Sequence, residues 1–532
     1  MDRIRSEGQN SHAAPPAGRT RREFLRTSAS AVAAAAVAAG RWSELQAAVG
    51  ESKIVIAYGI AILTLDPQKH DATVFESNLR NMYEPLITLS ADLTKLEPLL
   101  ATSFTRLNEL TVQFKLRQGV RFHNGEELDA QAVKFTVERV LNPETKAPLF
   151  TTYQPIARAD IVDKFTVNVV TKKPDPMLLR RMSSFHMNII PPKYFSTTPV
   201  DELARKPVGT GPYKFVSWVK DGDLVMEVNP DYWGPKASIN RVIVRTIPEA
   251  GTRVAALLAG DADIITAVWP DEIDRINRSG RARAITLPGN RVAFYMISVR
   301  KEPMNNKLVR QAINYASNMD GIIKAILGGH GFRRAVISNP WHVGFDPTVQ
   351  PYPYDPAKAK ALLAQAGYPG GVSIDMHAIQ GRYPKDKEIA EALAGELGKA
   401  GIKVSLKFHE WGTWIELADA SKLEGLIFAS WGNPWMDADG TYYPLFRSGG
   451  RYTSKWSGYK NDTLDALLEE GRTTLDEGKR REIYGRVQRL MQDDSPALFM
   501  HSLEDVYGVN QRIEWRPRSD EMVRHNEMAL KA

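Results

Sequence analysis

Pro207-Val208-Gly209-Thr210-Gly211-Pro212-Tyr213-Lys214-Phe215 stands near the middle of this 532-residue chain, and Asn229-Pro230-Asp231-Tyr232-Trp233-Gly234 follows it. The glycines and prolines of the first stretch suit a tight turn that brings backbone against backbone. The stretch is not a dinucleotide-binding loop, because a proline follows its second glycine and the third glycine is missing. The aromatic pair of the second stretch supplies large apolar surfaces before a turn, and we expect these rings to be structural.

On both sides of this stretch, short runs of β-forming residues alternate with runs at helical spacing. This alternation, with glycine and proline between the runs, indicates mixed α/β layers. The length exceeds what a single core usually supports and predicts two or three domains. We expect strands at residues 52–58, 112–116, 165–170, 224–228, 242–246, 372–378, 426–429, 497–500 and 506–509, helices at 71–86, 130–140, 356–366, 464–471 and 476–491, and a pair of helices within 307–327.

Three further stretches complete a pattern that extends over nearly the whole chain. They are Phe114-Lys115-Leu116-Arg117-Gln118-Gly119-Val120-Arg121-Phe122-His123-Asn124-Gly125, then Val309-Arg310-Gln311-Ala312-Ile313-Asn314-Tyr315-Ala316, and the run from Tyr354-Asp355-Pro356 to Ala366-Gly367-Tyr368-Pro369. With the central stretch, they occur in the order found in one family. The sequence resembles the extracytoplasmic solute-binding proteins of peptide and nickel ABC importers, the dipeptide/oligopeptide-binding type known as family 5.

The resemblance implies an α/β protein of two lobes with mixed sheets, a hinge of two strands, and an extra subdomain in the first lobe. A ligand enclosed between such lobes favours their closed form, which reports occupancy to a transporter. We expect the chain to cross between the lobes near residues 292–298 and 497–501. The expected limits are 50–295 plus 497–532 for the first lobe, 90–200 for its subdomain, and 296–496 for the second lobe.

The N-terminal region is typical of an exported protein. Thr20-Arg21-Arg22-Glu23-Phe24-Leu25-Arg26 precedes an alanine-rich apolar run at residues 31–39, which is too short to span a bilayer. The consecutive arginines resemble the twin-arginine export signal. We therefore expect residues 1–48 to be a signal peptide, removed by cleavage between Gly40 and Ala48, and to engage the twin-arginine export machinery.

The composition excludes several classes of protein. The chain has no cysteine, which rules out disulfides, thiolate metal sites, a cysteine nucleophile and a lipid-bearing cysteine. We therefore expect a soluble periplasmic protein. Its formal charge is +7, of which +3 belongs to residues 1–48 (seven Arg against four acids), which leaves 7 − 3 = +4. Because the lysines and arginines are also scattered, we expect no nucleic-acid partner.

The sequence also lacks the machinery of an enzyme. It contains no His-Glu-x-x-His, no Gly-x-Ser-x-Gly and no Walker lysine loop. Ser457-Gly458-Tyr459-Lys460 matches Ser-x-x-Lys but lacks the companion motifs of that enzyme class. We expect no catalytic residue and no cofactor. We also expect no protein-bound metal, because five of the ten histidines are expected to be well separated and structural or at the surface; these are His123, His342, His377, His409 and His501.

We expect one loop of the second lobe and one short segment of the first lobe to contact a ligand. Ile379-Gln380-Gly381-Arg382-Tyr383-Pro384 follows a predicted strand, so Arg382 and Tyr383 lie on a loop that can face the cleft. An arginine fork suits a carboxylate, and the resemblance to dipeptide-binding proteins implies that Arg382 holds the carboxylate of the ligand. From the first lobe, Tyr58 and Gly59 follow the first predicted strand and are further expected contacts.

Ser430-Trp431-Gly432-Asn433-Pro434-Trp435-Met436-Asp437-Ala438-Asp439-Gly440 resembles the tryptophan-containing loop of the family. We expect Trp431 or Trp435 to line the cleft, because indole faces suit sugar rings, apolar groups or cations. The resemblance to dipeptide binders implies an aspartate for the ligand amine at a position that Pro434 occupies here. Either Asp437 replaces that aspartate or the ligand has no amine at this place, because a buried ammonium without a carboxylate is costly.

The resemblance implies a monomeric periplasmic receptor that captures a peptide-like or other small anionic solute and delivers it to the permease of an ABC transporter. The missing aspartate is compatible with an oligopeptide held mainly by its backbone, an opine or a sugar. A metal held inside an organic chelate needs no clustered protein ligands, so a nickel-type chelate binder is an alternative of the same fold. A periplasmic hydrolase is the remaining alternative.

Overall fold

The computed structural model describes residues 52–220 and 222–531. The predicted signal peptide, residues 1–48, lies outside the described residues. None of the helices in the described ranges combines the length and the hydrophobicity that a membrane crossing requires.

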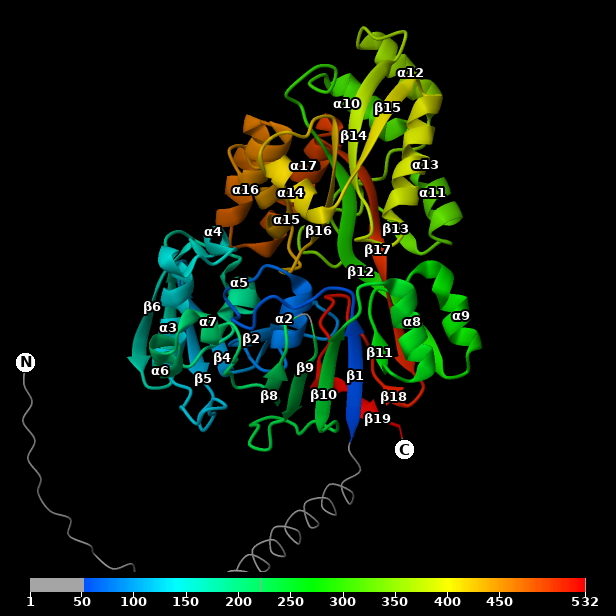
Figure 1. Ribbon diagram of the computed structural model, residues 1–532. Helices are drawn as coiled ribbons and strands as arrows, with labels where there is room; N and C mark the ends of the chain where they lie inside the picture. The colour runs from blue at the N-terminus through cyan, green and yellow to red at the C-terminus, as the bar shows by residue number, and fades with distance from the viewer. Residues whose placement is uncertain (1–51, 221, 532) are drawn as a thin grey trace, which may run out of the picture. The chain divides into compact units, whose positions relative to one another are not determined.

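One large mixed sheet joins the two lobes (Figure 1). Its strands are β1 (Lys53–Tyr58), β8 (Tyr213–Trp218), β9 (Leu224–Val228), β10 (Arg241–Thr246), β11 (Ile264–Ile265), β12 (Ala282–Ile297), β13 (Gly331–Arg333), β14 (Val372–Ile379), β15 (Ile402–His409), β16 (Leu426–Gly432) and β17 (Ala497–Asn510). Ten of them follow the order β15-β14-β16-β12-β17-β11-β1-β10-β9-β8, and β13 pairs with β17.

The long antiparallel strands β12 and β17 run side by side from one lobe into the other (Figure 1). In the first lobe, Ala282 of β12 and Val506 of β17 belong to one hydrophobic core. In the second lobe, Phe294 and Leu498 of the same strands belong to another core. The pairing register shifts between Pro288 and Val292, where the core changes. A bulge bends a strand and interrupts regular pairing, so this segment is the structural candidate for the hinge.

A separate antiparallel sheet builds the subdomain of the first lobe. Its strands are β4 (Ala101–Asn108), β5 (Thr111–Leu116), β6 (Ile156–Asp163) and β7 (Thr166–Thr171), in the order β4-β5-β7-β6. With helix α3 (Ala130–Leu141), this sheet encloses a core of its own that extends from Leu86 to Ile189. The residue limits of the lobes and of this subdomain stay a prediction.

The remaining elements cover the sheets or link their strands. They are α2 (Thr73–Leu79), α4 (Phe150–Tyr153), α5 (Leu178–Met182), α6 (Pro192–Thr197), α7 (Val200–Leu203), α8 (Ala250–Ala259), α9 (Ile273–Arg278), α10 (Lys307–Tyr315), α11 (Met319–Ile326), α12 (Pro356–Gln365), α13 (Asp386–Lys399), α14 (Trp411–Asp419), α15 (Asp439–Phe446), α16 (Asp462–Thr473) and α17 (Glu477–Asp494). Short strands pair as β2 (Ile87–Leu89) with β3 (Leu96–Pro98) and β18 (Ile513–Glu514) with β19 (Ala529–Leu530).

The central glycine stretch lies backbone against backbone with the segment after α2. The N–H of Gly211 donates to the carbonyl of Met82 and the N–H of Tyr213 to that of Asn81, both at 2.9 Å. A Cβ on Gly211 would lie 2.6 Å from the Asn81 carbonyl oxygen, so a larger residue would push the two segments apart. The predicted role of the glycines is confirmed. The helix predicted at 71–86 is longer than the observed one, because α2 ends at Leu79. The carbonyls of Asn81 and Met82, beyond this end, accept hydrogen bonds from the glycine stretch instead.

The buried carboxylate of Glu84 fixes the positions of Tyr232 and Trp233. Its carboxylate accepts from Tyr232 Oη at 2.7 Å, from Trp233 Nε1 at 2.9 Å and from Thr210 Oγ1 at 2.8 Å. Burial raises the pKa of Glu84 although these three donors lower it. Both aromatic rings therefore hold the central stretch in place, as expected of structural residues.

Candidate functional site

The loop between β14 and α13 carries Arg382 and is held by one carboxylate. Asp386 accepts from the N–H groups of Gly381 at 3.1 Å, Arg382 at 3.0 Å and Tyr383 at 3.1 Å. Gly381 has a φ of +82°, a conformation in which glycine avoids the steric cost of a side chain. The loop is thus a rigid turn that presents the side chains of Arg382 and Tyr383.

The guanidinium of exposed Arg382 is held in place by two aromatic residues but makes few hydrogen bonds. Its Cζ lies 3.7 Å from the ring centre of Trp411, a cation–π contact, and its Nε donates to Tyr383 Oη at 3.2 Å. Its two Nη groups make no hydrogen bond to any residue in the described ranges. A guanidinium edge held in this way can donate two parallel hydrogen bonds to a carboxylate.

Tyr383 lies between two arginines. Its ring centre is 5.5 Å from the Cζ of Arg382 and 5.9 Å from the Cζ of Arg291 on β12. Burial alone would raise the pKa of Tyr383, but the two guanidinium groups outweigh it and lower the pKa below its ordinary value. Two guanidinium groups therefore lie next to this ring, and Arg291 is paired with Glu521.

Arg291 and its acidic neighbours were not predicted from the sequence. Arg291 Nε lies 3.7 Å from Glu521 Oε1, and both groups are close to Asp505 on β17. Tyr507, two residues further along β17, is near Asp505 and also near Tyr58, since both raise its pKa. The only sequence signal for these residues is a short polar interruption in the otherwise apolar strands β12 and β17.

The predicted first-lobe contacts lie in a packed region. Tyr58 is 4% exposed, and its hydroxyl is 3.5 Å from Ser77 Oγ. Burial raises the pKa of Tyr58 well above its ordinary value. A Cβ on Gly59 would lie 2.9 Å from Arg253 Nη1, so the guanidinium fills the space beside this glycine. A ligand could reach the backbone of Gly59 more readily than the phenol of Tyr58.

The predicted tryptophan loop makes many internal contacts. Trp431 Nε1 donates to the Gly440 carbonyl at 2.9 Å, and its ring packs edge-on against Tyr452. Trp435 is 5% exposed, and its Nε1 has no hydrogen-bond partner among the described residues. Trp431 keeps a partly exposed face, whereas Trp435 lies deeper.

Asp437 is buried and already has a cationic partner. Its two oxygens accept from Arg480 Nη1 and Nη2 of α17, both at 2.8 Å. Burial would raise the pKa of Asp437, but Arg480 and then Arg180 lower it below its ordinary value. The structure thus gives this carboxylate a partner inside the protein, while its role toward a ligand stays a prediction.

Contacts between the lobes lie on two sides of the hinge strands. On one side, Lys385 Nζ of the Arg382 loop pairs with Asp271 Oδ2 of the first lobe at 2.8 Å. On the other, Arg180 Nη1 of α5 donates to the Trp435 carbonyl at 2.7 Å, and Arg181 Nη2 lies 3.7 Å from Asp439 Oδ2. The Arg382 loop and the tryptophan loop therefore both face the first lobe.

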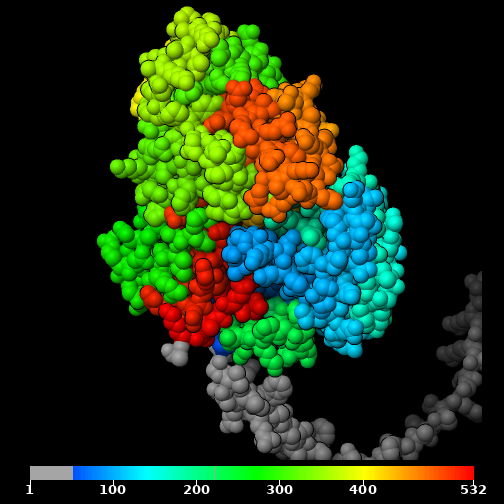
Figure 2. Space-filling view, turned by 180° about the vertical axis from the view of Figure 1, so that it is seen from behind, coloured from blue at the N-terminus to red at the C-terminus, as the bar shows by residue number. Residues whose placement is uncertain are grey.

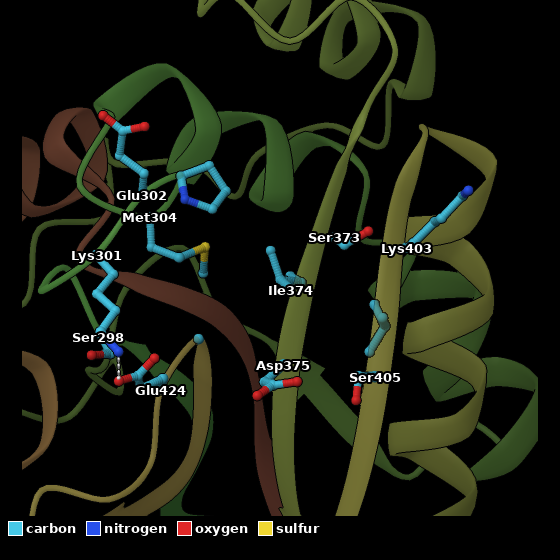
Figure 3. A pocket seen from close by; sticks show the side chains of 13 residues that line it. Ser298, Lys301, Glu302, Met304, Ser373, Ile374, Asp375, Lys403, Ser405 and Glu424 are labelled. Carbon is cyan, nitrogen blue, oxygen red and sulfur yellow. Dashed lines mark ion pairs between the residues drawn. The ribbon is translucent and has the colours of Figure 1, made fainter.

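Two cavities differ in their relation to these loops. A cavity of about 40 Å³ is lined by Asn290 of the hinge segment, by Pro434 of the second lobe, and by Thr73, Ser184 and Glu521 of the first lobe. A more open cavity of about 440 Å³ lies within the second lobe, beside the Lys301–Glu424 ion pair and strands β14 and β15 (Figure 3). None of the predicted ligand contacts lines either cavity, and the smaller one is reached by Pro434 of the tryptophan loop.

The histidines differ from expectation at one point. His377 of β14 and His409 of β15 lie together, with His377 Nδ1 3.0 Å from His409 Nε2. The expectation that they are separated is wrong, because the parallel pairing of β14 and β15 aligns the two segments. Within the described ranges, no group of three or more metal-binding side chains is present.

Comparisons with known proteins cover most of the chain. The sequence profile described as bacterial extracellular solute-binding proteins, family 5 Middle, matches residues 95–453. Heme-binding protein A of Haemophilus influenzae is 28% identical over 451 residues, which are 80% of this chain and 82% of that protein. The dipeptide-binding protein of Escherichia coli is 28% identical over 459 residues, which are 80% of this chain and 85% of that protein.

A solved structure shows the same fold. The ABC transporter-associated periplasmic binding protein DppA from Helicobacter pylori, in complex with peptide STSA, is 27% identical with a TM-score of 0.78. The match covers 90% of this chain and 98% of that one. The two-lobed α/β fold predicted from the sequence is confirmed.

Proposed function

Because the chain belongs to family 5 of the bacterial extracellular solute-binding proteins, we propose that it captures a small carboxylate-bearing solute, peptide-like in the first instance, between its two lobes. It is a solute receptor of an ABC importer and delivers the solute to the permease. It performs no chemistry of its own. Closure of the lobes over the solute is the signal that the permease reads.

Arg382 is the observation that carries this proposal. Its Nη groups are free of protein partners in the described ranges, its position is fixed by Trp411 and Tyr383, and a second guanidinium, Arg291, lies beyond Tyr383. A carboxylate in this place would accept a bidentate pair of hydrogen bonds from Arg382. A neutral solute would leave the guanidinium of Arg382 without an anionic partner, whereas Arg291 is already paired with Glu521.

We propose that the tryptophan loop contributes the partly exposed face of Trp431 to the cleft and that the first lobe contributes the backbone of Gly59. Trp435 and Tyr58, which are 5% and 4% exposed, lie behind them. We propose that Asp437 acts on the ligand indirectly, because its pair with Arg480 anchors the tryptophan loop on α17.

The proposal includes the route and the place of action. The twin-arginine motif at Arg21 and Arg22 supports export through the twin-arginine machinery to the periplasm, where the mature chain acts as a monomer. We propose a first lobe of 50–295 plus 497–532 and a second lobe of 296–496, and the core of the second lobe, which extends from Val292 to Met500, supports these limits to within four residues.

Other solutes remain candidates for the same site. A nickel-type chelate carries its own metal ligands, and the absence of a three-residue metal cluster from the described ranges is compatible with it. An opine carries carboxylates that Arg382 could hold. A sugar would use the tryptophan faces and not the guanidinium.

Titration calorimetry on Arg382 variants tests the proposal. The probes are dipeptides, opines, nickel–histidine chelates and neutral sugars. We expect a carboxylate-bearing probe to bind, and Arg382→Ala to weaken it by about 10- to 150-fold, since a hydrogen bond to a charged group contributes about 1.5–3 kcal/mol. Arg382→Lys should restore only part of the affinity, because an ammonium lacks the fork.

Arg278→Ala is the matched control, because Arg278 is exposed on α9 of the first lobe. It should leave affinity unchanged. Tightest binding of a sugar, or equal affinity in Arg382→Ala and the wild type, would contradict carboxylate capture by this residue.

A further inference from the structure

Lys385 connects the Arg382 loop to the first lobe. Its Nζ donates to Asp271 Oδ2 at 2.8 Å and lies 5.1 Å from the ring centre of Trp269. Trp269 and Asp271 belong to the turn before α9, and Val268, next to Trp269, is buried in the core of the first lobe. The ammonium therefore makes an ion pair and a cation–π contact with one anchored segment of the other lobe.

The backbone of Lys385 has a conformation that a lysine rarely adopts. Its φ is +57°, in the left-handed region that glycine and, less often, asparagine and aspartate occupy. Such a conformation costs free energy and persists only where the surrounding contacts hold it. Asp386 supplies part of these contacts, because it accepts from three N–H groups of the preceding loop. The strained residue of the Arg382 loop is thus the one that reaches the first lobe.

Lys385 has acidic neighbours in both lobes. Its side chain is 19% exposed, and its hydrogen bond with Asp271 is the main reason that its pKa is raised above the ordinary value. Glu388, in the first turn of α13, lies 3.9 Å from the same ammonium. Because Glu388 belongs to the second lobe, its contact with Lys385 does not depend on the position of the lobes. The contact with Asp271 forms only when the lobes meet.

This contact lies on one side of the hinge strands. Figure 1 shows α8 and α9 of the first lobe below β13 and α13 of the second lobe, and Figure 2 shows the same green segment, on the left, directly below the yellow-green surface of the second lobe. The contacts of Arg180 and Arg181 with the second lobe lie on the other side of these strands. The two sets of contacts thus hold opposite sides of the cleft.

We propose that Lys385, Asp271 and Trp269 form a latch that stabilises the closed form of the protein whether or not a solute is bound. The latch goes beyond the proposed function, because it sets the balance between open and closed lobes before a solute arrives. It also ties the loop that carries Arg382 to the first lobe. Because the apparent affinity for a ligand depends on the fraction of protein in the competent form, the latch contributes to affinity without contacting the solute.

Pulsed electron paramagnetic resonance on the solute-free protein tests the latch. Spin labels at Arg278→Cys on α9 and Glu391→Cys on α13 occupy exposed positions of the two lobes, and the natural chain has no cysteine. Lys385→Asn is the main variant, because asparagine tolerates the left-handed backbone and carries no charge. We expect the ratio of short to long distances to fall about 3- to 30-fold, the combined weight of an exposed ion pair and a cation–π contact.

A charge exchange separates the latch from a general effect of charge. Asp271→Lys places two cations together and should also lower the ratio, whereas Asp271→Lys combined with Lys385→Asp should raise it again, because an ion pair can form with its charges exchanged. Glu388→Gln is the matched control. It removes the acid that contacts Lys385 from within the second lobe, so the ratio should not fall.

The latch is overturned if the solute-free protein shows only the long distance, or if the ratio is unchanged in Lys385→Asn and Asp271→Lys while circular dichroism shows both to be folded. A fall in Glu388→Gln as large as that in Lys385→Asn would overturn it as well. None of these results depends on a solute, so failure of the latch leaves solute capture intact. Absence of dipeptide binding together with the expected shifts in distance would contradict the proposed function and not the latch.

Discussion

Replacing Arg480 with methionine is expected to lower the free energy of unfolding by about 3–5 kcal/mol, the cost of leaving one partner of a buried ion pair alone. Arg480 is 3% exposed and Asp437 is 1% exposed, and their two hydrogen bonds are both 2.8 Å. The carboxylate left behind keeps the N–H of Asp439 at 3.0 Å, and its nearest remaining cation is Arg180, whose Nε is 3.9 Å away. Urea unfolding followed by circular dichroism measures the change.

Arg447→Met is the matched control for this result. Arg447 pairs with Glu469 at 2.9 Å, but both side chains are exposed, so its loss should cost less than about 1 kcal/mol. The double variant Asp437→Leu with Arg480→Met should recover part of the lost stability, because apolar groups can replace a buried pair. Equal losses in Arg480→Met and Arg447→Met would show that the buried pair is not a stabilising element.

The second large effect is a loss of stability in mild acid. Burial lowers the pKa of His342 and His525 to about 3, and of His123, His186 and His501 to about 4. In the unfolded chain a histidine has a pKa of about 6.5. As pH falls below about 6.5, the unfolded state therefore takes up protons that the folded state does not, and stability decreases until the folded-state pKa values are reached.

The expected size follows from the linkage relation. Each of these histidines contributes a loss of about 1.4 kcal/mol near pH 5.5, and five of them together approach the whole stability of a typical domain. Urea unfolding at about pH 7.5, 6.5 and 5.5 measures the slope. His501→Leu should reduce it, since both ring nitrogens of His501 lack hydrogen-bond partners among the described residues. An unfolding free energy that is equal near pH 5.5 and pH 7.5 would refute this assignment.

Local patterns were enough to predict many elements. The helix expected at 356–366 is α12, Pro356–Gln365, because Asp355 caps it and proline occupies its first turn. The helix pair expected at 307–327 is α10 and α11, with caps at Asn306 and Asn318. In both cases the signals for the start and the end of the element are adjacent in the sequence.

The hinge could not be predicted from local signals. Two separate strands were expected at 497–500 and 506–509, but β17 is continuous from Ala497 to Asn510. The polar residues between the two apolar runs suggested a loop. In the structure these residues, Asp505 among them, pair with β12, and pairing across a long sequence separation overrides their local preference.

Only part of the candidate site could be predicted from the sequence, for the same reason. Arg382 stands on a turn that follows a recognisable strand, so its place could be predicted. Arg291, Asp505 and Glu521 come together because β12 pairs with β17 and the C-terminal segment returns to the first lobe. The ion pair of Asp437 with Arg480 could not be predicted either, because the arginine comes from α17, which is distant in the sequence.

The central claim is that a solute is captured between closing lobes, and a distance measurement across the cleft tests it most directly. The chain has no cysteine, so Thr151→Cys on α4 and Lys479→Cys on α17 would carry the only two spin labels, at exposed positions of the first and second lobes. Pulsed electron paramagnetic resonance then reports the distance with and without the best-binding probe. The account predicts a shorter distance whose population follows the occupancy of the site, whereas one-to-one binding with an unchanged distance would contradict it.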